Sequence, residues 1–107
     1  MRENATPEID LEEFAAARGS ALLVDIRDPD EYASGHVPGA VLIPMSQLAN
    51  RVDEIDKTLP VFVICASGNR SSAMTDLLRA SGFDAVSVAG GTAAWTRSGR
   101  PLEEELA

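Results

Sequence analysis

The stretch VFVICASGNRSSAMTDLL, residues 61–78, changes from an apolar run to a polar turn and then to apolar residues at helical spacing. Residues 60–65 are typical of a strand buried on both faces, and residues 70–82 are typical of a helix. We expect the buried face of this helix to be formed by Ala73, Met74, Leu77 and Leu78. Cys65, the only cysteine of the chain, is therefore predicted to lie at the carboxyl end of a strand.

Strands and helices are predicted to alternate along the rest of the chain. Apolar runs predict further strands over residues 21–26, 41–44 and 85–89. Further helices are predicted over residues 9–19, 28–35, 46–55 and 92–99. This alternation indicates an α/β fold, with a mostly parallel sheet covered by helices on both faces. In such folds ligands bind beyond the carboxyl ends of the strands, which is where Cys65 is expected.

The starts of three predicted helices match capping patterns. These are Asp10 with Glu13, Asp28 with Glu31, and Ser46 alone. Gly19 and Gly35 are expected to end the first two helices.

Composition limits the classes of function. The chain has 107 residues, 45% of them apolar and 24% charged, which predicts a single globular domain. A net charge of −8 argues against a nucleic-acid partner, because phosphate backbones require a basic surface. No apolar stretch approaches the roughly 20 residues that cross a bilayer, so no membrane partner is expected. The first ten residues contain no apolar core of a secretory signal.

One cysteine and one histidine exclude several kinds of site. Neither an internal disulfide, a C-x-x-C redox pair nor a zinc cluster is expected. The sequence therefore predicts no metal and no cofactor. A free thiol without a partner in the chain favours a reducing compartment, so we expect a cytoplasmic protein.

The residues after Cys65 are suited to stabilising a negative charge on its sulfur. Ser67, Gly68 and Asn69 tolerate a tightly curved backbone, so the loop can direct several N–H groups inward. The free N–H groups of the following helix and the positive charge of Arg70 act in the same direction. A lone cysteine after an apolar strand is more often a small core residue. The loop and the helix start favour a nucleophile with a lowered pKa instead.

Other candidate residues have structural alternatives. His36 could act as a base, but a turn histidine bonded to the backbone is the simpler interpretation. Asp25 and Arg27 are expected to form a pair that ties loops together, although Arg27 could also reach the mouth of the site. Trp95 is expected in the core. Gly90 and its neighbour suggest a phosphate loop only weakly, because no lysine or fuller glycine pattern accompanies them.

Three segments in this order resemble a single-domain rhodanese, a thiosulfate-type sulfurtransferase. They are VDIRDPDEYASGHVPGAVLIP (24–44), VICASGNRSS (63–72) and AGGTAAWTRSGRPL (89–102). The resemblance covers about residues 9–102 within a single domain of residues 1–107. It implies a rhodanese-like fold with a central five-stranded parallel sheet flanked by helices on both faces.

The resemblance also implies roles for individual residues. Cys65 would be the catalytic nucleophile, and Asp25, Arg27 and His36 match motifs with a structural or supporting role. The substrate-binding loop would comprise Ala66, Ser67, Gly68, Asn69, Arg70 and Ser71. Cys65 would take sulfur from a donor such as thiosulfate or a persulfide and pass it to cyanide, a small thiol or a protein thiol.

Two alternatives to a sulfurtransferase stay open. Loops of related phosphatases and arsenate reductases place five residues between cysteine and arginine, whereas four separate Cys65 from Arg70. This shorter loop favours a single sulfur atom over a phosphate. Many relatives carry a basic residue where this chain has Ala66, which keeps open a binding module or persulfide carrier with little turnover of its own.

Overall fold

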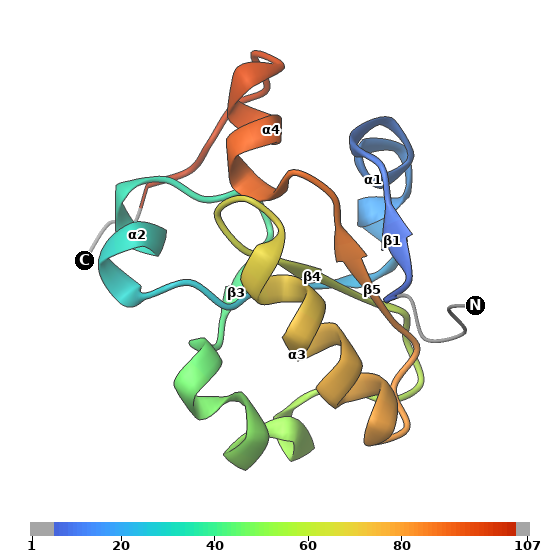
Figure 1. Cartoon of the computed structure of the whole chain (residues 1–107). Coiled ribbons are helices and arrows are strands. Elements are labelled where there is room, and N and C mark those ends of the chain that lie inside the picture. The colour runs from blue at the N-terminus through green and yellow to red at the C-terminus, as the bar shows by residue number, and fades with distance from the viewer. Residues whose placement is uncertain (1–5, 105–107) are drawn as a thin grey trace.

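A five-stranded parallel sheet forms the centre of the protein (Figure 1). The structure is a computed structural model that describes residues 6–104. The prediction that the extreme N-terminus contains no secretory signal therefore falls partly outside the described residues. Within residues 6–104 the sheet order is β1-β5-β4-β2-β3. The strands are β1 (Glu8–Ile9), β2 (Leu22–Asp25), β3 (Val41–Leu42), β4 (Val61–Ile64) and β5 (Ala85–Val88).

Helices cover both faces of this sheet, as the sequence predicts. One face carries α3 (Asn69–Ala80) and the 3₁₀ turns η2 (Met45–Asn50) and η3 (Val52–Glu54). The other face carries α1 (Leu11–Ala17), α2 (Pro29–Ser34) and α4 (Gly91–Arg97). The turn η1 (Arg18–Ser20) joins α1 to β2. Figure 1 shows α3 crossing the sheet, with the green segment of η2 and η3 beside it. The predicted α/β fold class is confirmed.

The side chains of β4 alternate between the two faces. Val61, Val63 and the following Cys65 pack on the side of α3. Phe62 and Ile64 pack on the side of α1 and α4. This alternation explains the uninterrupted apolar run in the sequence, because both faces of a central parallel strand are buried.

The predicted helix over residues 46–55 is wrong. The chain forms η2 and η3 instead, with bonds between residues three apart, such as Gln47 N–H to the Pro44 oxygen and Ile55 N–H to the Val52 oxygen. The residue between the turns, Arg51, has a φ of −123°, outside the helical region. Ser46 resembles the cap of a helix, and this pattern was misleading. Asn50, inside the predicted helix, is of a residue type that favours helix ends over helix interiors.

Strand β1 was missed because it contains only two residues. Ile9, predicted as the start of the first helix, pairs with Val88 of β5 instead. Asp10 then caps α1, and its side chain accepts the Glu13 N–H at 2.8 Å. Gly19 does not end the helix directly but lies within η1. The fifth strand thus comes from a segment with no apolar run of its own.

The buried face of α3 agrees only in part with the predicted one. Leu78 is buried as predicted, whereas Ala73 is exposed and the polar residues Ser71 and Thr75 are buried. Met74 and Leu77 are partly buried and pack against the core. The side of α3 that faces the sheet therefore carries two hydroxyl groups, so the end of β4 has a polar environment.

Candidate active site

Cys65 lies directly after β4, at the carboxyl edge of the sheet, and only 1% of its surface is exposed. Its side chain points toward the face covered by α3, with buried Val63 two residues before it on the same side. The same edge holds Asp25 at the end of β2 and Gly90 after β5. Three neighbouring strands therefore bring their following loops together around the thiol.

The backbone that follows Cys65 turns its N–H groups toward the sulfur, as the sequence predicts. The Gly68 N–H donates to Cys65 Sγ at 3.0 Å, and the Ser71 N–H donates at 3.3 Å. Ser71 is the third residue of α3, so its N–H is one of the donors that a helix start leaves free. Gly68 has a φ of +102°, in the left-handed region that favours glycine.

A pair of buried hydroxyl groups completes this environment. Ser71 Oγ lies 3.5 Å from Cys65 Sγ and 2.7 Å from Ser87 Oγ, and both serines are fully buried. Ser87 lies beside Val63 in the sheet, so its side chain faces α3 as Cys65 does. In the structure Cys65 Sγ donates to Ser71 Oγ, and the Ser71 hydroxyl donates to the Gly68 oxygen. When the sulfur is a thiolate, rotation of the Ser71 hydroxyl away from the Gly68 oxygen lets it donate to the sulfur, while Ser87 donates to Ser71.

Opposing effects determine the acidity of the thiol. Burial raises the pKa of Cys65, but the hydrogen bonds to its sulfur outweigh burial and lower the pKa below its ordinary value. The largest lowering contribution comes from the Ser71 hydroxyl, followed by the N–H groups of Ser71, Gly68 and Ser67. Cys65 is therefore a buried thiol with increased thiolate character.

The remaining loop residues lie around this ring of donors. Ser67 and Asn69 are exposed, and Ala66 is half-buried. Gly68 also accepts hydrogen bonds. Its carbonyl oxygen accepts one from the Ser71 hydroxyl at 3.1 Å and one from the Ser72 hydroxyl at 3.3 Å. The loop is thus fixed at its centre, while its outer side chains face solvent.

Arg70 does not place an unpaired charge beside the sulfur. Its guanidinium donates to both carboxylate oxygens of Glu31 at 3.2 Å, and both side chains are about one-third exposed. The hydrogen bonds from Arg70 are the largest cause that lowers the pKa of Glu31. Glu31 also accepts the Asp28 N–H at 3.0 Å, which is one half of a capping box at α2. The positive charge expected at the mouth is therefore neutralised by α2.

The turn between β5 and α4 and the start of α4 are hydrogen-bonded to the backbone of the cysteine loop. The Thr92 N–H donates to the Cys65 oxygen at 2.8 Å, and the Ala93 N–H donates to the Ala66 oxygen at 2.9 Å. Gly91 has a φ of +59°, and a Cβ there would lie 2.5 Å from the Cys65 oxygen. The glycine pair of the sequence thus allows a close backbone approach within the protein.

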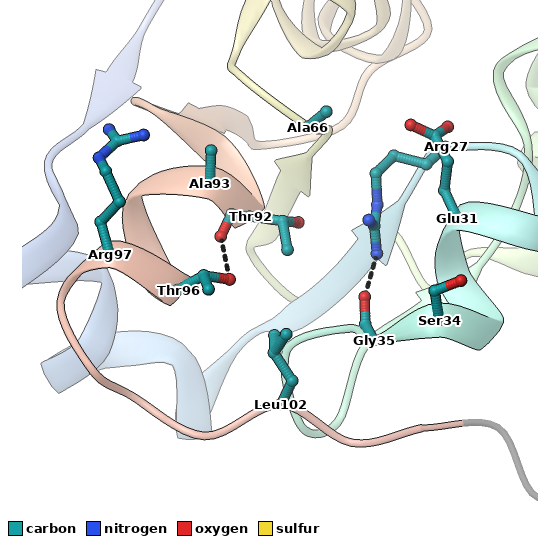
Figure 2. A pocket seen from close by; sticks show the side chains of 10 residues that line it. All are labelled: Arg27, Glu31, Ser34, Gly35, Ala66, Thr92, Ala93, Thr96, Arg97 and Leu102. Atoms are coloured by element: carbon teal, nitrogen blue, oxygen red, sulfur yellow. Dashed lines mark hydrogen bonds between the residues drawn. The ribbon is translucent and has the colours of Figure 1, made fainter.

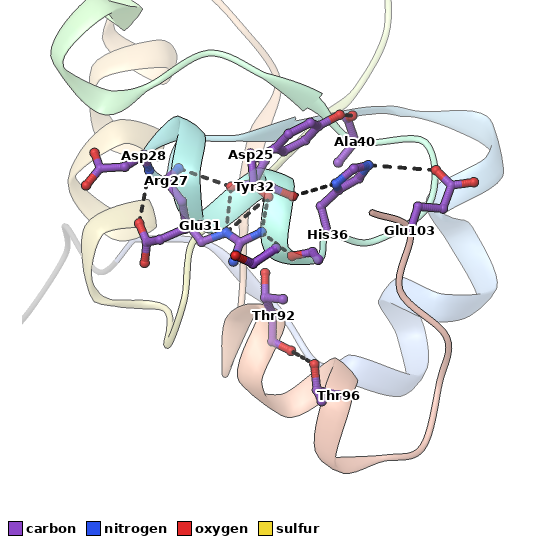
Figure 3. Close-up of polar contacts among 12 residues, drawn as sticks. Asp25, Arg27, Asp28, Glu31, Tyr32, His36, Ala40, Thr92, Thr96 and Glu103 are labelled. Carbon is purple, nitrogen blue, oxygen red and sulfur yellow. Dashed lines mark hydrogen bonds and ion pairs between the residues drawn. The ribbon is translucent and has the colours of Figure 1, made fainter. Parts of the chain in front are cut away.

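Asp25 and Arg27 form a buried pair below the mouth of the site (Figure 3). Arg27 Nη2 donates to Asp25 Oδ2 at 2.9 Å and to the Gly35 oxygen at 2.8 Å. This geometry matches the expected tie between loops. Arg27 also lines the cleft described below, so the alternative that it reaches the mouth holds as well.

His36 is held by structural contacts (Figure 3). Its ring stacks on Tyr32 with centroids 3.7 Å apart, and its Nδ1 lies 2.8 Å from the Tyr32 oxygen. Its backbone pairs with that of Glu103 through two bonds of 2.8 Å. Trp95 is likewise buried, and its Nε1 donates to the Pro101 oxygen at 2.7 Å. These contacts agree with the structural alternatives for both residues.

An open cleft of about 590 Å³ has Ala66, the residue after Cys65, in its wall (Figure 2). Residues of α2, α4, the segment between β2 and α2, and the C-terminal segment line it, including Arg27, Glu31, Thr92, Arg97 and Leu102. Figure 2 shows Arg97 on one side of the cleft and Arg27 with Glu31 on the other. The cleft gives a ligand a place to bind beside the loop.

Three residues of this region were not predicted from the sequence: Ser87, Glu31 as the partner of Arg70, and Thr92. A serine within an otherwise apolar buried strand was the available indication for Ser87. Nothing local marks Glu31 as the partner of Arg70, because 39 residues separate them. Across residues 6–104, no group of three His, Cys, Asp or Glu side chains gathers in a way that could hold a metal ion, and no helix has the length and apolarity to cross a membrane.

Comparison with known proteins gives consistent similarities. The model of the rhodanese-like domain family matches residues 10–98. The uncharacterized protein YqhL of Bacillus subtilis (strain 168) is 39% identical over 85 residues, which are 78% of this chain and 68% of that protein. The sequence similarity thus includes the cysteine loop and the turn before α4.

Solved structures are similar over almost the whole chain. The crystal structure of a rhodanese-related protein from Thermoplasma volcanium is 29% identical with a TM-score of 0.89, and the match covers 92% of this chain and 99% of that chain. A rhodanese-like domain protein from Staphylococcus aureus is 33% identical with a TM-score of 0.85, covering 94% and 100%. The predicted rhodanese-like sheet is confirmed.

Proposed function

This chain belongs to the rhodanese-like domain family, and from that premise we propose that it is a sulfurtransferase that carries sulfane sulfur as a persulfide on Cys65. The observation that supports this most directly is the set of donors aimed at a buried sulfur. The N–H groups of Gly68 and Ser71 donate to Sγ, and the Ser71 hydroxyl oxygen lies 3.5 Å from it as a hydrogen-bond partner. Such donors stabilise both a thiolate and a terminal persulfide anion.

The proposed first half-reaction consumes a sulfur donor. With thiosulfate, the Cys65 thiolate attacks the outer sulfur, and the S–S bond of thiosulfate breaks with its electron pair on the departing sulfite. The new S–S bond, about 2.05 Å long, places the charged outer sulfur further into the loop than the original sulfur. The donors of the loop then bind the persulfide charge in place of the thiolate charge.

The second half-reaction restores the thiolate. A nucleophile, either cyanide or a thiolate, attacks the outer sulfur, and the electrons of the S–S bond return to Cys65. The product is thiocyanate or the acceptor persulfide. No residue needs to act as a general base at the sulfur, because the hydrogen bonds already favour the thiolate, and this agrees with the structural setting of His36.

The charges around the loop favour a monoanionic donor over thiosulfate. Ala66 adds no cation, and Arg70 is paired with Glu31. A doubly negative donor therefore meets few free positive charges at the mouth. We propose that a persulfide of a small thiol or of a protein is the better donor.

Mass spectrometry of the intact protein tests the covalent intermediate. After incubation with thiosulfate or a small-thiol persulfide, Cys65 should gain one sulfur, about 32 Da, because the step is nucleophilic and covalent. Cys65→Ser should gain nothing and should have no cyanide-dependent turnover. Asn50→Ala, which changes an exposed side chain outside the loop, serves as the control. An unmodified Cys65 with every donor would contradict the proposal.

A persulfide carrier is the second candidate, and the neutralised Arg70 together with the absence of a second cysteine favours it. A carrier would form the persulfide, release it only slowly to cyanide or small thiols, and transfer it rapidly to one protein thiol. A phosphatase is disfavoured by the four-residue spacing between Cys65 and Arg70. Aryl phosphate hydrolysis that is lost in Cys65→Ser would overturn that assignment.

A further inference from the structure

We propose that Ser87 is a positioning residue that acts through Ser71: it stabilises negative charge on Cys65 Sγ and so makes the cysteine a better leaving group when the persulfide is passed on. The inference rests on the proposed sulfur transfer and assigns a residue to its second half-reaction. It depends on the burial of the two serines, on the direction of their hydrogen bonds and on their position behind the sulfur.

The Ser87 hydroxyl has a single partner in the protein. Ser87 lies between Val86 and Val88 in β5 and is fully buried. Its Oγ lies 2.7 Å from Ser71 Oγ, and within residues 6–104 it has no other hydrogen-bond partner. A buried hydroxyl group is unfavourable unless it is hydrogen-bonded. Any effect of this hydroxyl on the site therefore passes through Ser71.

The hydrogen bonds of the two serines run in one direction. The Ser71 hydroxyl donates its hydrogen to the Gly68 oxygen at 3.1 Å, and its oxygen accepts the Cys65 thiol at 3.5 Å. The Ser71 oxygen has a second lone pair, and Ser87 has no other acceptor, so Ser87 donates to Ser71. The hydrogen of Ser71 therefore stays available for the sulfur once Cys65 loses its proton.

Turning the Ser71 hydroxyl toward a thiolate does not leave the Gly68 oxygen without a donor. That oxygen also accepts the Ser72 hydroxyl at 3.3 Å. The bond from Ser87 polarises the Ser71 hydroxyl, because hydrogen bonds in a chain strengthen one another. The Ser71 hydroxyl is the largest contribution that lowers the pKa of Cys65. Ser87 thus strengthens the main donor to the sulfur.

Charged groups on the surrounding elements do not contact either serine. Arg70 is paired with Glu31, and Arg27 is paired with Asp25. Within the described part of the chain, none of these side chains is hydrogen-bonded to Ser71 or Ser87. The other charged side chains on β1, α3 and α4 are exposed, including Glu8 beside Ser87 in the sheet, Asp76, Arg79 and Arg97. The serine pair is therefore a neutral source of stabilisation, separate from the ion pairs.

The serine pair lies on the buried side of the sulfur. Ser71 and Ser87 are fully buried, whereas the loop is exposed at Ser67 and Asn69. Substrates reach the loop from its exposed side, so the outer sulfur of a persulfide extends away from the two serines. Their hydrogen bonds therefore stabilise charge on the inner sulfur, Sγ, more than charge on the outer sulfur.

This difference affects the two half-reactions in opposite ways. When an acceptor takes the outer sulfur, the electron pair of the S–S bond returns to Sγ, and a thiol of lower pKa leaves faster. When Cys65 attacks a donor, a lower pKa makes the fully formed thiolate a weaker nucleophile. Ser87 is therefore expected to speed release of the sulfur and not its uptake.

Alkylation of Cys65 by iodoacetamide over a series of pH values tests the link through Ser71. Ser87→Ala should raise the pKa of Cys65 and with it the midpoint of the profile. In a Ser71→Ala background the same change should add nothing, because the two hydroxyls act as one chain. Thr75→Val is the matched control, since it removes a fully buried α3 hydroxyl that has no hydrogen-bond partner, and it should leave the midpoint unchanged. An unshifted midpoint in Ser87→Ala, or the same shift with and without Ser71, would overturn the inference.

Single-turnover rates separate the two half-reactions at a pH well above all the midpoints. Release of thiocyanate from the preformed persulfide by cyanide should be roughly two- to threefold slower in Ser87→Ala, because one hydrogen bond contributes modestly and the leaving thiolate feels part of it. Persulfide formation from thiosulfate should not become slower. Equal slowing of both half-reactions would indicate distortion of the loop and would contradict the role of Ser87.

The two readouts also separate this inference from the proposed function. The alkylation midpoints need no sulfur donor, so an unshifted midpoint in Ser87→Ala contradicts the role of Ser87 whether or not sulfur is transferred. A wild-type protein that forms no persulfide with any donor contradicts the proposed function, while a shifted midpoint would still support the action of Ser87 on the sulfur.

Discussion

At the residue scale, the largest contributions that lower the pKa of Cys65 come from groups that carry no full charge. Burial alone raises the pKa of a thiol, yet the hydroxyl of Ser71 and nearby N–H groups lower it overall. Arg70, the nearest expected cation, is bound to Glu31. The contacts of Ser71 therefore have more influence on the sulfur than the charge of Arg70.

Replacing Ser71 tests this conclusion. Ser71→Ala removes the hydroxyl, the largest lowering contribution, but keeps the backbone N–H, so the pKa of Cys65 should rise. The midpoint of the pH dependence of Cys65 alkylation by iodoacetamide measures this change. Ser72→Ala is the matched control, since the Ser72 hydroxyl bonds only the Gly68 oxygen. A midpoint shared by wild type and Ser71→Ala would refute the role of the hydroxyl.

Glu31 is predicted to limit the use of anionic donors. Glu31→Gln keeps an oxygen that can accept the Asp28 N–H but removes the charge that neutralises Arg70. Persulfide formation with thiosulfate should therefore become faster, and the KM for thiosulfate should fall. The stability loss should be at most about 1 kcal/mol, because the pair is partly exposed.

The kinetics of a control variant and the pH dependence of the free energy of unfolding both test the Glu31 prediction. Glu54→Gln in η3 removes a similar ion pair, the one with Arg51, and should leave thiosulfate kinetics unchanged. Because Arg70 lowers the pKa of Glu31 in the folded protein, the stabilisation is present above the ordinary carboxyl pKa and is lost as the pH falls through the lowered value. An unchanged or slower reaction with thiosulfate would show that Arg70 is not restrained by Glu31.

At the element scale, the turn between β5 and α4 fixes the cysteine loop. Gly91→Ala places a Cβ 2.5 Å from the Cys65 oxygen at a φ of +59°. Backbone strain of this kind costs about 1–3 kcal/mol, so the free energy of unfolding should fall by at least this amount. Gly99→Ala has a φ of +85° but nothing within 4 Å, so it isolates the cost of the backbone conformation. Equal losses in denaturant unfolding of the two variants would mean that the close approach does not matter.

Most elements could be predicted from the sequence because their patterns are local. The buried run 61–65 contains apolar residues for both faces of the sheet, and Asp28 with Glu31 caps α2 as expected. The inward N–H groups after Cys65 follow from a flexible Gly68 and the start of a helix. Each of these features depends on residues within a few positions of one another.

Features that depend on distant residues could not be predicted. Strand β1 exists because Ile9 pairs with Val88, and two residues give no periodic pattern. Ser87 meets Ser71 only after β5 and α3 pack together. The predicted helix over residues 46–55 failed because a pattern of apolar residues alone does not distinguish an α-helix from successive 3₁₀ turns.

At the scale of the whole molecule, the ionisation of Cys65 is linked to folding. An unfolded cysteine titrates near pH 8.5, whereas the pKa of Cys65 is lowered in the folded chain. Between these two values the unfolded state binds more protons, so stability rises with pH there and is lost as the pH falls through the folded value. The sulfur thus contributes its full stabilisation above about pH 8.5, and this contribution is lost as the pH falls through the lowered value.

Comparison with Cys65→Ser isolates this contribution from those of other groups. The difference in the free energy of unfolding between wild type and Cys65→Ser should grow in favour of wild type as the pH rises, and become constant above about 8.5. Denaturant unfolding at a series of pH values measures it. A difference independent of pH would contradict the lowered pKa.

The backbone donors around Cys65 have a further consequence for the response to ionic strength. Dissolved ions screen exposed charges, but they have little effect on short contacts inside a protein. Added salt should therefore leave the anionic state of the sulfur almost untouched, while weakening the attraction of any charged small molecule to the rim. The reactivity of the Cys65 sulfur and the binding of charged substrates would then respond differently to the same rise in ionic strength, since they depend on separate parts of the molecule.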